Sequence, residues 1–407
     1  MRWSCVASIA VILTAALPAA AQRMPVRPMP EPVRPIPTRP TLEDAVRQSA
    51  RRIEASAAEA QAAAQREVQR QERETIRQSY ERDLDGRWFR RGEIVVATET
   101  PGATEAAATL GLKELRRDVL AAAGLTLHTF AAPAGAKTQA LFAALKAARP
   151  SDAVDLNYIY VFEGAPAGPI RSLAPSDGGG SGPKLVAVID TALPERPAGL
   201  SGVAIRARRF GPGPGRASDH ALAVATVLAD TAGRQGLVLL AADVSEPSPL
   251  PGASASAIAQ ALDWAAAFRT PVVNVSLTGP PNAALAAVAR RVMARGVVIV
   301  AAAGNDGPRA TPPYPAALPE VVGVTAVDGR LRIWRRATQG PHVDFAAPGV
   351  KVAVAGGEWT GTSLAAPVVS GLLVRRGGGL DALAASARDL GDPGRDTVYG
   401  HGFVSAP

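Results

Sequence analysis

Short apolar segments alternate with helical segments through the second half of the chain. Continuous apolar strands separated by helices are typical of a parallel sheet that is covered on both faces. The pattern predicts an α/β fold with a mostly parallel, doubly wound sheet, in which ligands bind beyond the carboxyl ends of the strands. Strands are expected at residues 185–189, 204–208, 237–241, 272–276, 297–302 and 321–326, and helices at residues 221–229, 253–268, 283–295 and 363–374.

A second, smaller α/β pattern occupies residues 86–165, and its order of elements is compatible with a ferredoxin-like split unit. The segment that follows, residues 166–183, is rich in proline, glycine and serine, which neither continue a helix nor stack in a sheet. We therefore expect a linker there, and the main domain boundary before a larger domain at residues 184–407. In the small unit, strands are expected at residues 93–97, 126–130 and 156–162, and helices at residues 109–123 and 137–148.

The first residues follow the pattern of a secretory signal peptide. A basic start at Arg2 precedes a mostly apolar run from Cys5 to Leu17 and small residues that end at Ala21. We expect residues 1–21 to be removed. An uncleaved membrane anchor is the alternative, but the run is shorter than the roughly 20 residues that span a bilayer. The mature protein is thus expected to be soluble and exported, either secreted or periplasmic, without a stable membrane span.

Two more segments precede the small unit. Residues 22–40 carry prolines throughout, which disfavours a helix and predicts an extended linker. Residues 41–85 are rich in alanine, arginine and glutamate and contain no glycine or proline, and Thr41 with Asp44 resembles a capping box, so a long helix is expected. Its apolar positions are mostly alanine and form no convincing heptad seam. A solvated helix and a helix that binds a partner or itself both remain open.

Composition and charge exclude several classes of protein. The 407 residues are 47% hydrophobic and 20% charged, which suits a globular chain with a sizeable core and excludes wholesale disorder. The single cysteine, Cys5, excludes an intramolecular disulfide scaffold and a cysteine-rich zinc site. The net charge of +8 comes from arginines scattered among acids without aromatic interleaving, so no nucleic-acid partner is expected. The sequence contains no acidic cluster such as D-x-D-x-D, and no metal or other cofactor is expected.

Four residues with useful chemistry lie where strands end or helices begin. Asp190 ends the apolar run KLVAVID, and His220 opens the apolar helix HALAVATVLA. Asn305 follows the strand VVIVAAAG, and Ser363 lies in GTSLAAP at the start of a helix, where backbone N–H groups are free. Taken singly, each has an ordinary structural explanation. Asp190 and Asn305 suit turns, His220 suits a surface position, and Ser363 suits an N-cap.

Together, the four residues supply what nucleophilic acyl transfer requires. A serine hydroxyl is a weak nucleophile, so an imidazole must accept its proton and a carboxylate must fix the tautomer of that imidazole. The oxyanion that forms needs hydrogen-bond donors, here the Asn305 side-chain amide and the backbone N–H of Ser363. His220 is the histidine that begins a helix between Asp190 and Asn305. The chain order Asp, His, Ser is the order of the triad in subtilisin.

Residues 183–407 resemble the subtilases, the subtilisin-like serine proteases. The resemblance rests on AVIDTA, DHALAVA, VVIVAAAGNDGP and GTSLAAP in this order, with NVSLTGP and DFAAPG as supporting segments. It implies a subtilisin-like fold, a triad of Asp190, His220 and Ser363, and Asn305 as an oxyanion donor. It also implies a strand edge that pairs with a bound peptide and a primary specificity pocket for medium or large uncharged side chains. The edge would comprise Ser276, Leu277 and Thr278, and the pocket Ala302, Ala303 and Gly304.

Two motifs depart from the family pattern. Ala192 stands where glycine is usual in the aspartate motif, and residues 220–223 read H-A-L-A where H-G-T-H is usual. The catalytic side chains are retained and the replacements are small or apolar, which indicates repacking beside the site.

The resemblance also gives the small α/β unit a role, because secreted subtilases commonly carry a propeptide that assists folding and inhibits the site. Residues 86–165 would be this propeptide domain and the protein's own inhibitory partner, with self-cleavage between Glu163 and Lys184. The expected function is that of an exported serine endopeptidase that acts on proteins or peptides and is made as a self-processing proenzyme. The family does not explain the helix at residues 41–85.

Two alternative functions remain. The altered histidine motif allows a catalytically silent subtilase-like module that binds peptides in the same cleft; labelling by a fluorophosphonate separates it from an enzyme. The glycine run at residues 211–215, GPGPG, allows a doubly wound nucleotide-binding protein. That run, however, does not lie between a strand and an apolar helix with the spacing G-x-G-x-x-G.

Overall fold

The structure is a computed structural model of the chain. It describes residues 41–162, 165–168, 184–215, 217–247, 252–354, 356–377 and 379–406. The expected signal peptide, the linker at 22–40 and residues 169–183 of the second linker lie outside the described residues. The chain divides into two compact bodies, Met1–Gln65 and Arg66–Pro407. The second body contains both the smaller α/β unit and the larger unit that follows it. None of the helices in the described part is both long enough and apolar enough to cross a membrane.

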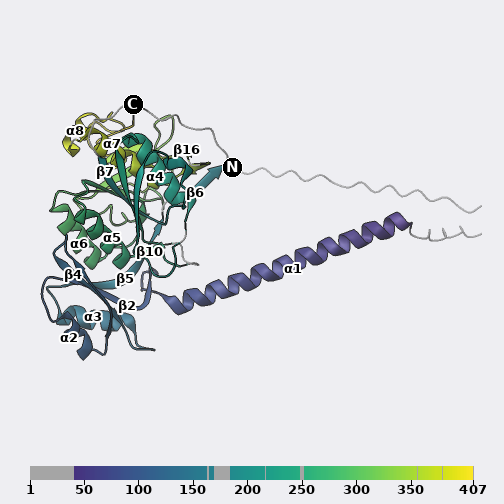
Figure 1. Cartoon of the computed structure of the whole chain (residues 1–407), viewed down its shortest axis with the longest axis horizontal. Coiled ribbons are helices and arrows are strands. Elements are labelled where there is room, and N and C mark those ends of the chain that lie inside the picture. Colours follow the sequence, from purple (N-terminus) through teal and green to yellow (C-terminus); the bar gives the residue numbers. More distant parts are fainter. Residues whose placement is uncertain are drawn as a thin grey trace, which may run out of the picture. The chain divides into compact units, whose positions relative to one another are not determined.

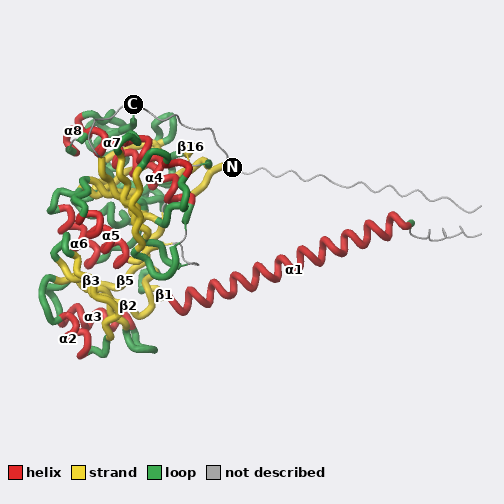
Figure 2. Tube along the Cα trace, viewed as in Figure 1, coloured by secondary structure: helices red, strands yellow, loops and turns green. Residues whose placement is uncertain are grey.

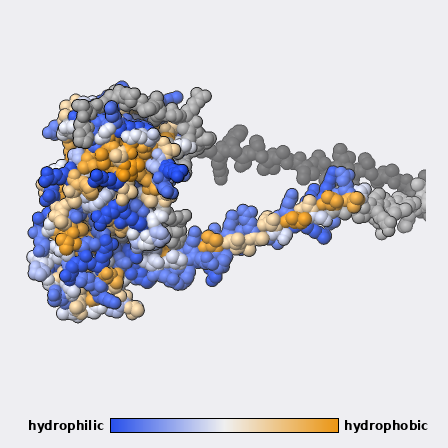
Figure 3. All heavy atoms as spheres, in the orientation of Figure 1, coloured by the Kyte–Doolittle hydropathy of each residue, from blue (hydrophilic) through white to orange (hydrophobic). Residues whose placement is uncertain are grey.

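The long helix expected near the N-terminus is α1 (Leu42–Ser79). It ends earlier than expected, because residues Tyr80–Arg82 form strand β1 and pair with β2 (Trp88–Thr98). Charged and apolar side chains are mixed along the surface of α1, as Figure 3 shows. Leu42, Val46, Ile53 and Val68 are its large exposed apolar side chains.

Residues 88–162 form a β-α-β-β-α-β unit with the antiparallel strand order β5-β2-β4-β3, which is the ferredoxin-like arrangement. The expected fold class of this unit is therefore confirmed (Figure 1). After β2, its elements are α2 (Ala103–Thr109), β3 (Lys113–Leu120), β4 (Leu125–Ala131), α3 (Thr138–Ala148) and β5 (Ala153–Phe162).

The expected helix at residues 109–123 is wrong. The run KELRRDVL contains several good helix formers, yet it is strand β3. This strand lies at the sheet edge with most side chains exposed, and it pairs with β4 from Lys113 opposite Ala131 to Leu120 opposite Leu125. Pairing with β4 thus outweighs the local helix propensity, as tertiary context often does.

The parallel sheet has the strand order β15-β14-β13-β11-β7-β9-β8, and all its neighbouring strands are parallel. Alternate side chains of β7 pack on opposite faces: Val186 and Val188 join the cluster that includes α4 and α7, whereas Ala187 and Ile189 join α5 and α6. Figure 2 shows the strands between these helices. The expected doubly wound sheet is confirmed. Its strands are β7 (Lys184–Asp190), β8 (Ala204–Arg209), β9 (Leu237–Asp243), β11 (Val272–Val275), β13 (Val298–Ala302), β14 (Val322–Val327) and β15 (Phe345–Pro348).

The covering helices are close to their expected positions. They are α4 (Asp219–Ala232), α5 (Ala255–Ala267), α6 (Ala283–Met293) and α7 (Thr362–Arg376). The short helices η1 (Ala198–Leu200) and α8 (Leu380–Ala385) complete the larger unit.

Short strands connect the two sheets. Strands β10 (Gly252–Ser254) and β12 (Leu277–Thr278) belong to the larger unit by sequence, but both pair antiparallel with β5 of the smaller one. A third sheet has the order β16-β17-β6. Its strands are β16 (Val352–Val354), β17 (Gly357–Thr360) and β6 (Ala165–Gly168).

Strand β6 corrects one expectation from the sequence. The proline- and glycine-rich segment that begins at residue 166 was expected not to stack in any sheet, yet Ala165–Gly168 pairs with β17. Strand pairing uses backbone groups, and a proline is tolerated at a sheet edge. Four residues of low strand propensity can therefore pair where a partner strand is already in place.

Candidate active site

Three of the residues singled out from the sequence lie together beyond the carboxyl end of β7. Asp190 is the last residue of β7, and His220 and Ser363 are the second residues of α4 and α7. His220 Nδ1 lies 3.1 and 3.0 Å from the two carboxylate oxygens of Asp190. On the other side of the ring, Nε2 lies 3.1 Å from Ser363 Oγ. All three side chains are buried, so the imidazole bridges a carboxylate and a hydroxyl away from bulk water.

Local hydrogen bonds hold these side chains in place. The backbone N–H of Thr191 donates to Asp190 Oδ1 at 2.7 Å. Ser218 caps α4 by accepting from the Ala221 N–H at 3.2 Å, which fixes the first turn that carries His220. Each group that meets at the imidazole is thus positioned by a strand end or a helix start.

Asn305 lies beside the start of α7. Its Oδ1 accepts two hydrogen bonds from Thr362, from the backbone N–H at 3.0 Å and from the hydroxyl at 2.9 Å. Because both Thr362 groups donate, the Asn305 amide is oriented with its oxygen toward Thr362. Its Nδ2 group is then able to donate elsewhere. The role of Thr362 was not predicted from the sequence, although its position in GTS, next to Ser363, was a usable signal.

Gly304, expected in the specificity pocket, has a backbone that favours glycine. Its φ is +108°, and a Cβ there would lie 2.8 Å from both Pro313 Cγ and Thr338 Oγ1. Its N–H donates to Thr362 Oγ1 at 3.2 Å. The turn that delivers Asn305 therefore depends on a residue without a side chain.

The other expected pocket residues lie at the end of β13. Ala302 is its last residue, and the Ala303 carbonyl accepts a hydrogen bond from His342 Nε2 at 3.0 Å. A carbonyl oxygen can only accept, so Nε2 carries the proton that is donated. Burial lowers the pKa of His342. His342 thus supports the strand end that leads to Asn305, a role the sequence analysis did not anticipate.

The expected peptide-binding edge is occupied by a strand of the same chain. Ser276 is buried, and its hydroxyl donates to the Ser363 carbonyl at 3.1 Å. The next two residues form β12, in which Leu277 lies opposite Phe162 and Thr278 opposite Val161 of β5. On its other side, the end of β5 pairs with β10. The end of β5 is therefore held between two strands of the larger unit.

Two aromatic side chains flank the imidazole of His220. The Phe162 ring lies 6.0 Å from it, at 57°. The Trp359 ring lies 6.1 Å from it, at 71°, and is buried. The sequence did not mark either aromatic residue, because neither belongs to a catalytic motif. Phe162 lies on β5 and Trp359 on β17, and the pairing of these strands is known from the structure and not from the sequence.

A buried charge cluster joins the smaller α/β unit to the unit that contains the parallel sheet. Glu246, which follows β9, accepts from the Tyr80 hydroxyl at 3.1 Å and from Arg90 Nη1 at 2.5 Å. Burial raises the pKa of Glu246, and the adjacent Arg90 guanidinium opposes that rise. The carboxylate is therefore held by groups from residues 80–90, outside the parallel sheet.

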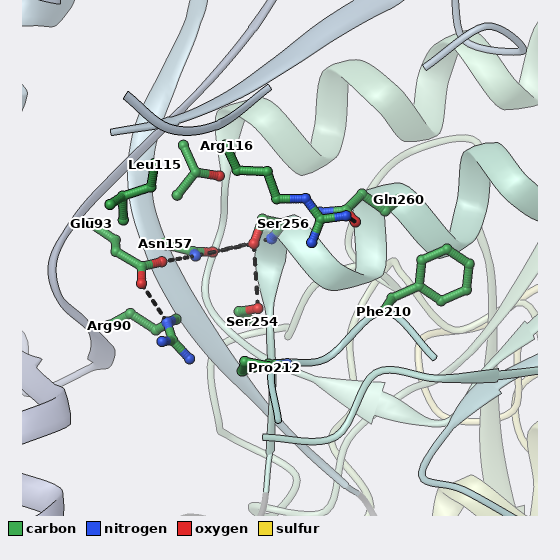
Figure 4. A pocket seen from close by; sticks show the side chains of 11 residues that line it. Arg90, Glu93, Leu115, Arg116, Asn157, Phe210, Pro212, Ser254, Ser256 and Gln260 are labelled. Atoms are coloured by element: carbon green, nitrogen blue, oxygen red, sulfur yellow. Dashed lines mark hydrogen bonds and ion pairs between the residues drawn. The ribbon is translucent and has the colours of Figure 1, made fainter. Parts of the chain in front are cut away.

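A cavity of about 250 Å³ lies next to this cluster. Figure 4 shows a chain of hydrogen bonds along it, from Arg90 through Glu93 and Asn157 to Ser256. The residues come from β2, β3, β4 and β5 on one side and from β10, α5 and the segment after β8 on the other. The cavity belongs to the contact between the smaller and larger units, and its lining does not include the three residues around the imidazole.

Two carboxylates make reciprocal contacts across the same boundary. Asp155 of β5 accepts from the Ala283 N–H at the start of α6, and Asp263 of α5 accepts from the Ala123 N–H, both at 2.7 Å. Burial raises the pKa of both aspartates, while these backbone donors oppose the rise. Each unit therefore caps a backbone group of the other.

No group of three or more His, Cys, Asp or Glu side chains that could hold a metal ion occurs among the residues described.

Comparison with known proteins adds to this geometry. Residues 185–376 match the subtilase family, Peptidase_S8. They are a subtilase domain. The matched residues include Asp190, His220, Asn305 and Ser363, the four positions expected from the sequence.

The subtilase domain also has relatives among characterised proteins. The chain is 34% identical over 168 residues to subtilisin DY of Bacillus licheniformis, which covers 37% of this chain and 60% of that protein. It is 33% identical over 162 residues to the minor extracellular protease Epr of Bacillus subtilis, which covers 36% of this chain and 25% of that protein. The chain therefore spans between a quarter and three fifths of these two relatives.

A solved structure resembles more of the chain. The crystal structure of fervidolysin from Fervidobacterium pennivorans, described as a keratinolytic enzyme related to subtilisin, aligns with a TM-score of 0.65. The alignment covers 81% of this chain and 62% of fervidolysin at 19% identity. At this identity the likeness establishes the fold, and it extends beyond the subtilase domain.

Proposed function

We propose that this protein is an exported serine endopeptidase, made as a proenzyme that cleaves itself. The observation that carries the proposal is the His220 imidazole, whose two nitrogens lie within 3.1 Å of the Asp190 carboxylate and the Ser363 hydroxyl. The match to the subtilase family over residues 185–376 supports the same chemistry.

In the proposed reaction, Ser363 Oγ attacks the carbonyl carbon of the peptide bond while His220 Nε2 accepts its proton. Asp190 accepts a hydrogen bond from Nδ1–H, which orients the ring and stabilises the imidazolium. The carbonyl oxygen becomes an oxyanion, to which Asn305 Nδ2 and the Ser363 backbone N–H donate. His220 then protonates the leaving amine. A water molecule, activated by the same imidazole, hydrolyses the acyl-enzyme and restores the serine.

The smaller unit is the proposed propeptide domain, because its last strand lies where a substrate would lie. Strand β5 pairs with β10 and β12 and brings Phe162 beside His220. Strand β6 pairs with β17, which ends at Thr360, three residues before Ser363. The chain is thus paired on both sides of the nucleophile. Pairing of an extended peptide with a strand edge is a common mode of peptide recognition.

This arrangement narrows the region in which self-cleavage is expected. Phe162 is the last residue of β5 that pairs with β12, and Ala165 is the first residue of β6 that pairs with β17. Cleavage between them fits both strands, and we propose that self-cleavage takes place within this interval. Residues 163 and 164 in this interval, like residues 169–183 in the wider interval from Glu163 to Lys184 that the sequence allowed, lie outside the described residues.

Reaction with a fluorophosphonate probe tests the function directly. An enzyme with a proton-accepting imidazole at 3.1 Å from the hydroxyl should be labelled on Ser363, and peptide mass mapping identifies the residue. A His220→Ala variant, which retains the serine without its base, should label far more slowly. Absence of labelling in processed protein would favour the catalytically silent peptide-binding module.

Substrate preference should follow the strand that occupies the cleft. Tyr160 is fully buried, and its hydroxyl donates to the Pro280 carbonyl at 2.7 Å. A Cβ on Gly279 would lie 2.5 Å from the Tyr160 ring, so the glycine leaves room for an aromatic side chain. Val161, in contrast, is 45% exposed. The cleft therefore selects the residue at the position of Tyr160 more strongly than its neighbour.

A peptide substrate with the sequence of residues 157–168 allows this preference to be measured. Phenylalanine in place of Tyr160 should lower kcat/KM roughly two- to tenfold, the worth of one hydrogen bond of about 0.5–1.5 kcal/mol. Alanine in that place should lower it further, because the aromatic contacts are also lost. Alanine in place of Val161 is the matched control and should change kcat/KM little. Equal effects at the two positions would contradict the assigned register.

A further inference from the structure

The sheet β16-β17-β6 presents a strand edge directly beside the nucleophile. Strand β17 is the central strand, with β16 antiparallel on one side and β6 antiparallel on the other. In the second pair, Thr360 lies opposite Ala165, Trp359 opposite Pro166 and Glu358 opposite Gly168. The edge of β17 that faces away from β16 is therefore a surface for an extended peptide segment, and Ala165–Gly168 occupies it.

Strand β17 is also in contact with the catalytic machinery. The buried Trp359 ring packs edge-on against the His220 imidazole, with 6.1 Å between ring centroids. The strand leads through Gly361 into the start of α7, which carries Ser363. On this edge, Ala165–Gly168 follows β5 in the chain after residues 163 and 164. It therefore has the position of the residues that follow a bond cleaved between Phe162 and Ala165.

Cleavage between Phe162 and Ala165 would separate the two paired strands. Strand β5 would remain with the propeptide domain, whereas β6 would remain joined to β7 through residues 169–183. Fifteen residues, 169–183, are the covalent link between these two strands. A link of this short length makes the binding of β6 to β17 intramolecular, with an effective concentration in the millimolar range. The effective concentration of β6 at the β17 edge would therefore exceed the concentration of most peptide substrates.

We propose that Ala165–Gly168 remains on the β17 edge after self-cleavage and competes there with the residues that follow the cleaved bond in other substrates. The inference rests on the proposed endopeptidase function and adds a tethered competitor to it. Substrates that extend beyond the cleaved bond encounter this competitor. Substrates that end at the cleaved bond in a small leaving group do not need the β17 edge and are unaffected.

The experiment compares processed enzyme with and without β6 attached. A recognition sequence for a site-specific protease is placed within residues 169–183 of the full chain, and the self-processed protein is then cut there. Two substrates share the same residues before the cleaved bond. One ends in a p-nitroanilide, and the other continues for four residues after the bond and carries a fluorophore and a quencher. The uncut form of the same variant is the control, and intact mass verifies that the peptide with Ala165–Gly168 has left.

Release of the peptide should raise kcat/KM for the extended substrate roughly two- to tenfold, mostly through a lower KM, with no change for the anilide. Adding the released peptide back at millimolar concentration should reverse the gain. Unchanged kcat/KM for the extended substrate after verified release would overturn the inference, as would equal gains for both substrates. If neither form hydrolyses either substrate, the proposed endopeptidase function fails and the inference fails with it; anilide hydrolysis by both forms separates the two failures.

Discussion

Replacing Ser363 with alanine is expected to leave the chain uncut and to lower kcat by about 10⁶-fold, the loss that follows removal of the nucleophilic serine in a subtilisin. The reason is geometric: Ser363 Oγ is the hydroxyl within 3.1 Å of His220 Nε2. Intact mass of the purified full chain, before and after incubation, measures self-cleavage, and a peptide anilide measures turnover. The unmodified protein should split between Phe162 and Ala165 under the same conditions.

A second serine on the same helix provides a matched control. Ser370 is also buried, and its hydroxyl donates to Asn274 Oδ1 at 3.0 Å, away from the imidazole. Ser370→Ala should cost about 1 kcal/mol in the free energy of unfolding while leaving self-cleavage intact. Splitting of the Ser363→Ala chain at the same bond would show that another protease processes this protein. If the unmodified chain also stays whole, the self-processing proposal is contradicted, and probe labelling decides whether the site is active.

Asn305→Ala is expected to lower kcat by about 10²–10³-fold with little change in KM, because the lost donor acts on the oxyanion and not on the bound substrate. The magnitude is that of the corresponding change in a subtilisin, about 2.7–4 kcal/mol. Steady-state kinetics on a peptide anilide measure the change. An unchanged kcat would exclude Asn305 as an oxyanion donor.

The contacts of Asn305 permit a sharper version of this test. Asn305 Oδ1 accepts two hydrogen bonds from Thr362, so alanine also removes an anchor of α7. Asn305→Asp retains an oxygen for both donors and replaces the Nδ2 donor with a second, negatively charged oxygen. If donation to the oxyanion is the function, this isosteric variant should lose at least as much kcat as alanine. Recovery of activity in Asn305→Asp would instead show that the anchoring of Thr362 is what matters.

The sequence was sufficient to predict the parallel sheet because the local hydrophobic pattern and the final environment of its strands agree. Strands such as residues 185–189 are continuous apolar runs, and β7 is buried on both faces with Asp190 at its end. The same pattern placed the four candidate residues at strand ends and helix starts, where parallel strands bring them to one edge. Their approach within hydrogen-bond distance around His220 required the structure, since no spacing in the sequence determines it.

The sequence was insufficient where pairing partners decide the structure. Residues 113–120 favour a helix locally, yet β4 draws them into the sheet edge as β3. Ala165–Gly168 has no strand pattern at all and depends on β17 for its conformation. Thr362, Trp359 and His342 were missed for a related reason. They support the site through contacts with residues that are distant in sequence, namely Asn305, His220 and Ala303.

Strand β5 has a consequence for how the parallel sheet folds. The smaller unit joins β3 to β4 across a short turn and, at most, β2 ending at Thr98 to β5 beginning at Ala153, whereas the parallel sheet joins β7 ending at Asp190 to β11 beginning at Val272. Folds of low contact order form quickly and parallel sheets form slowly. The smaller unit can thus present β5 as a completed edge on which β10 and β12 assemble. Once β5 is cut away, the larger unit would lack this template, so its persistence would rest on a high barrier to unfolding and not on ready refolding.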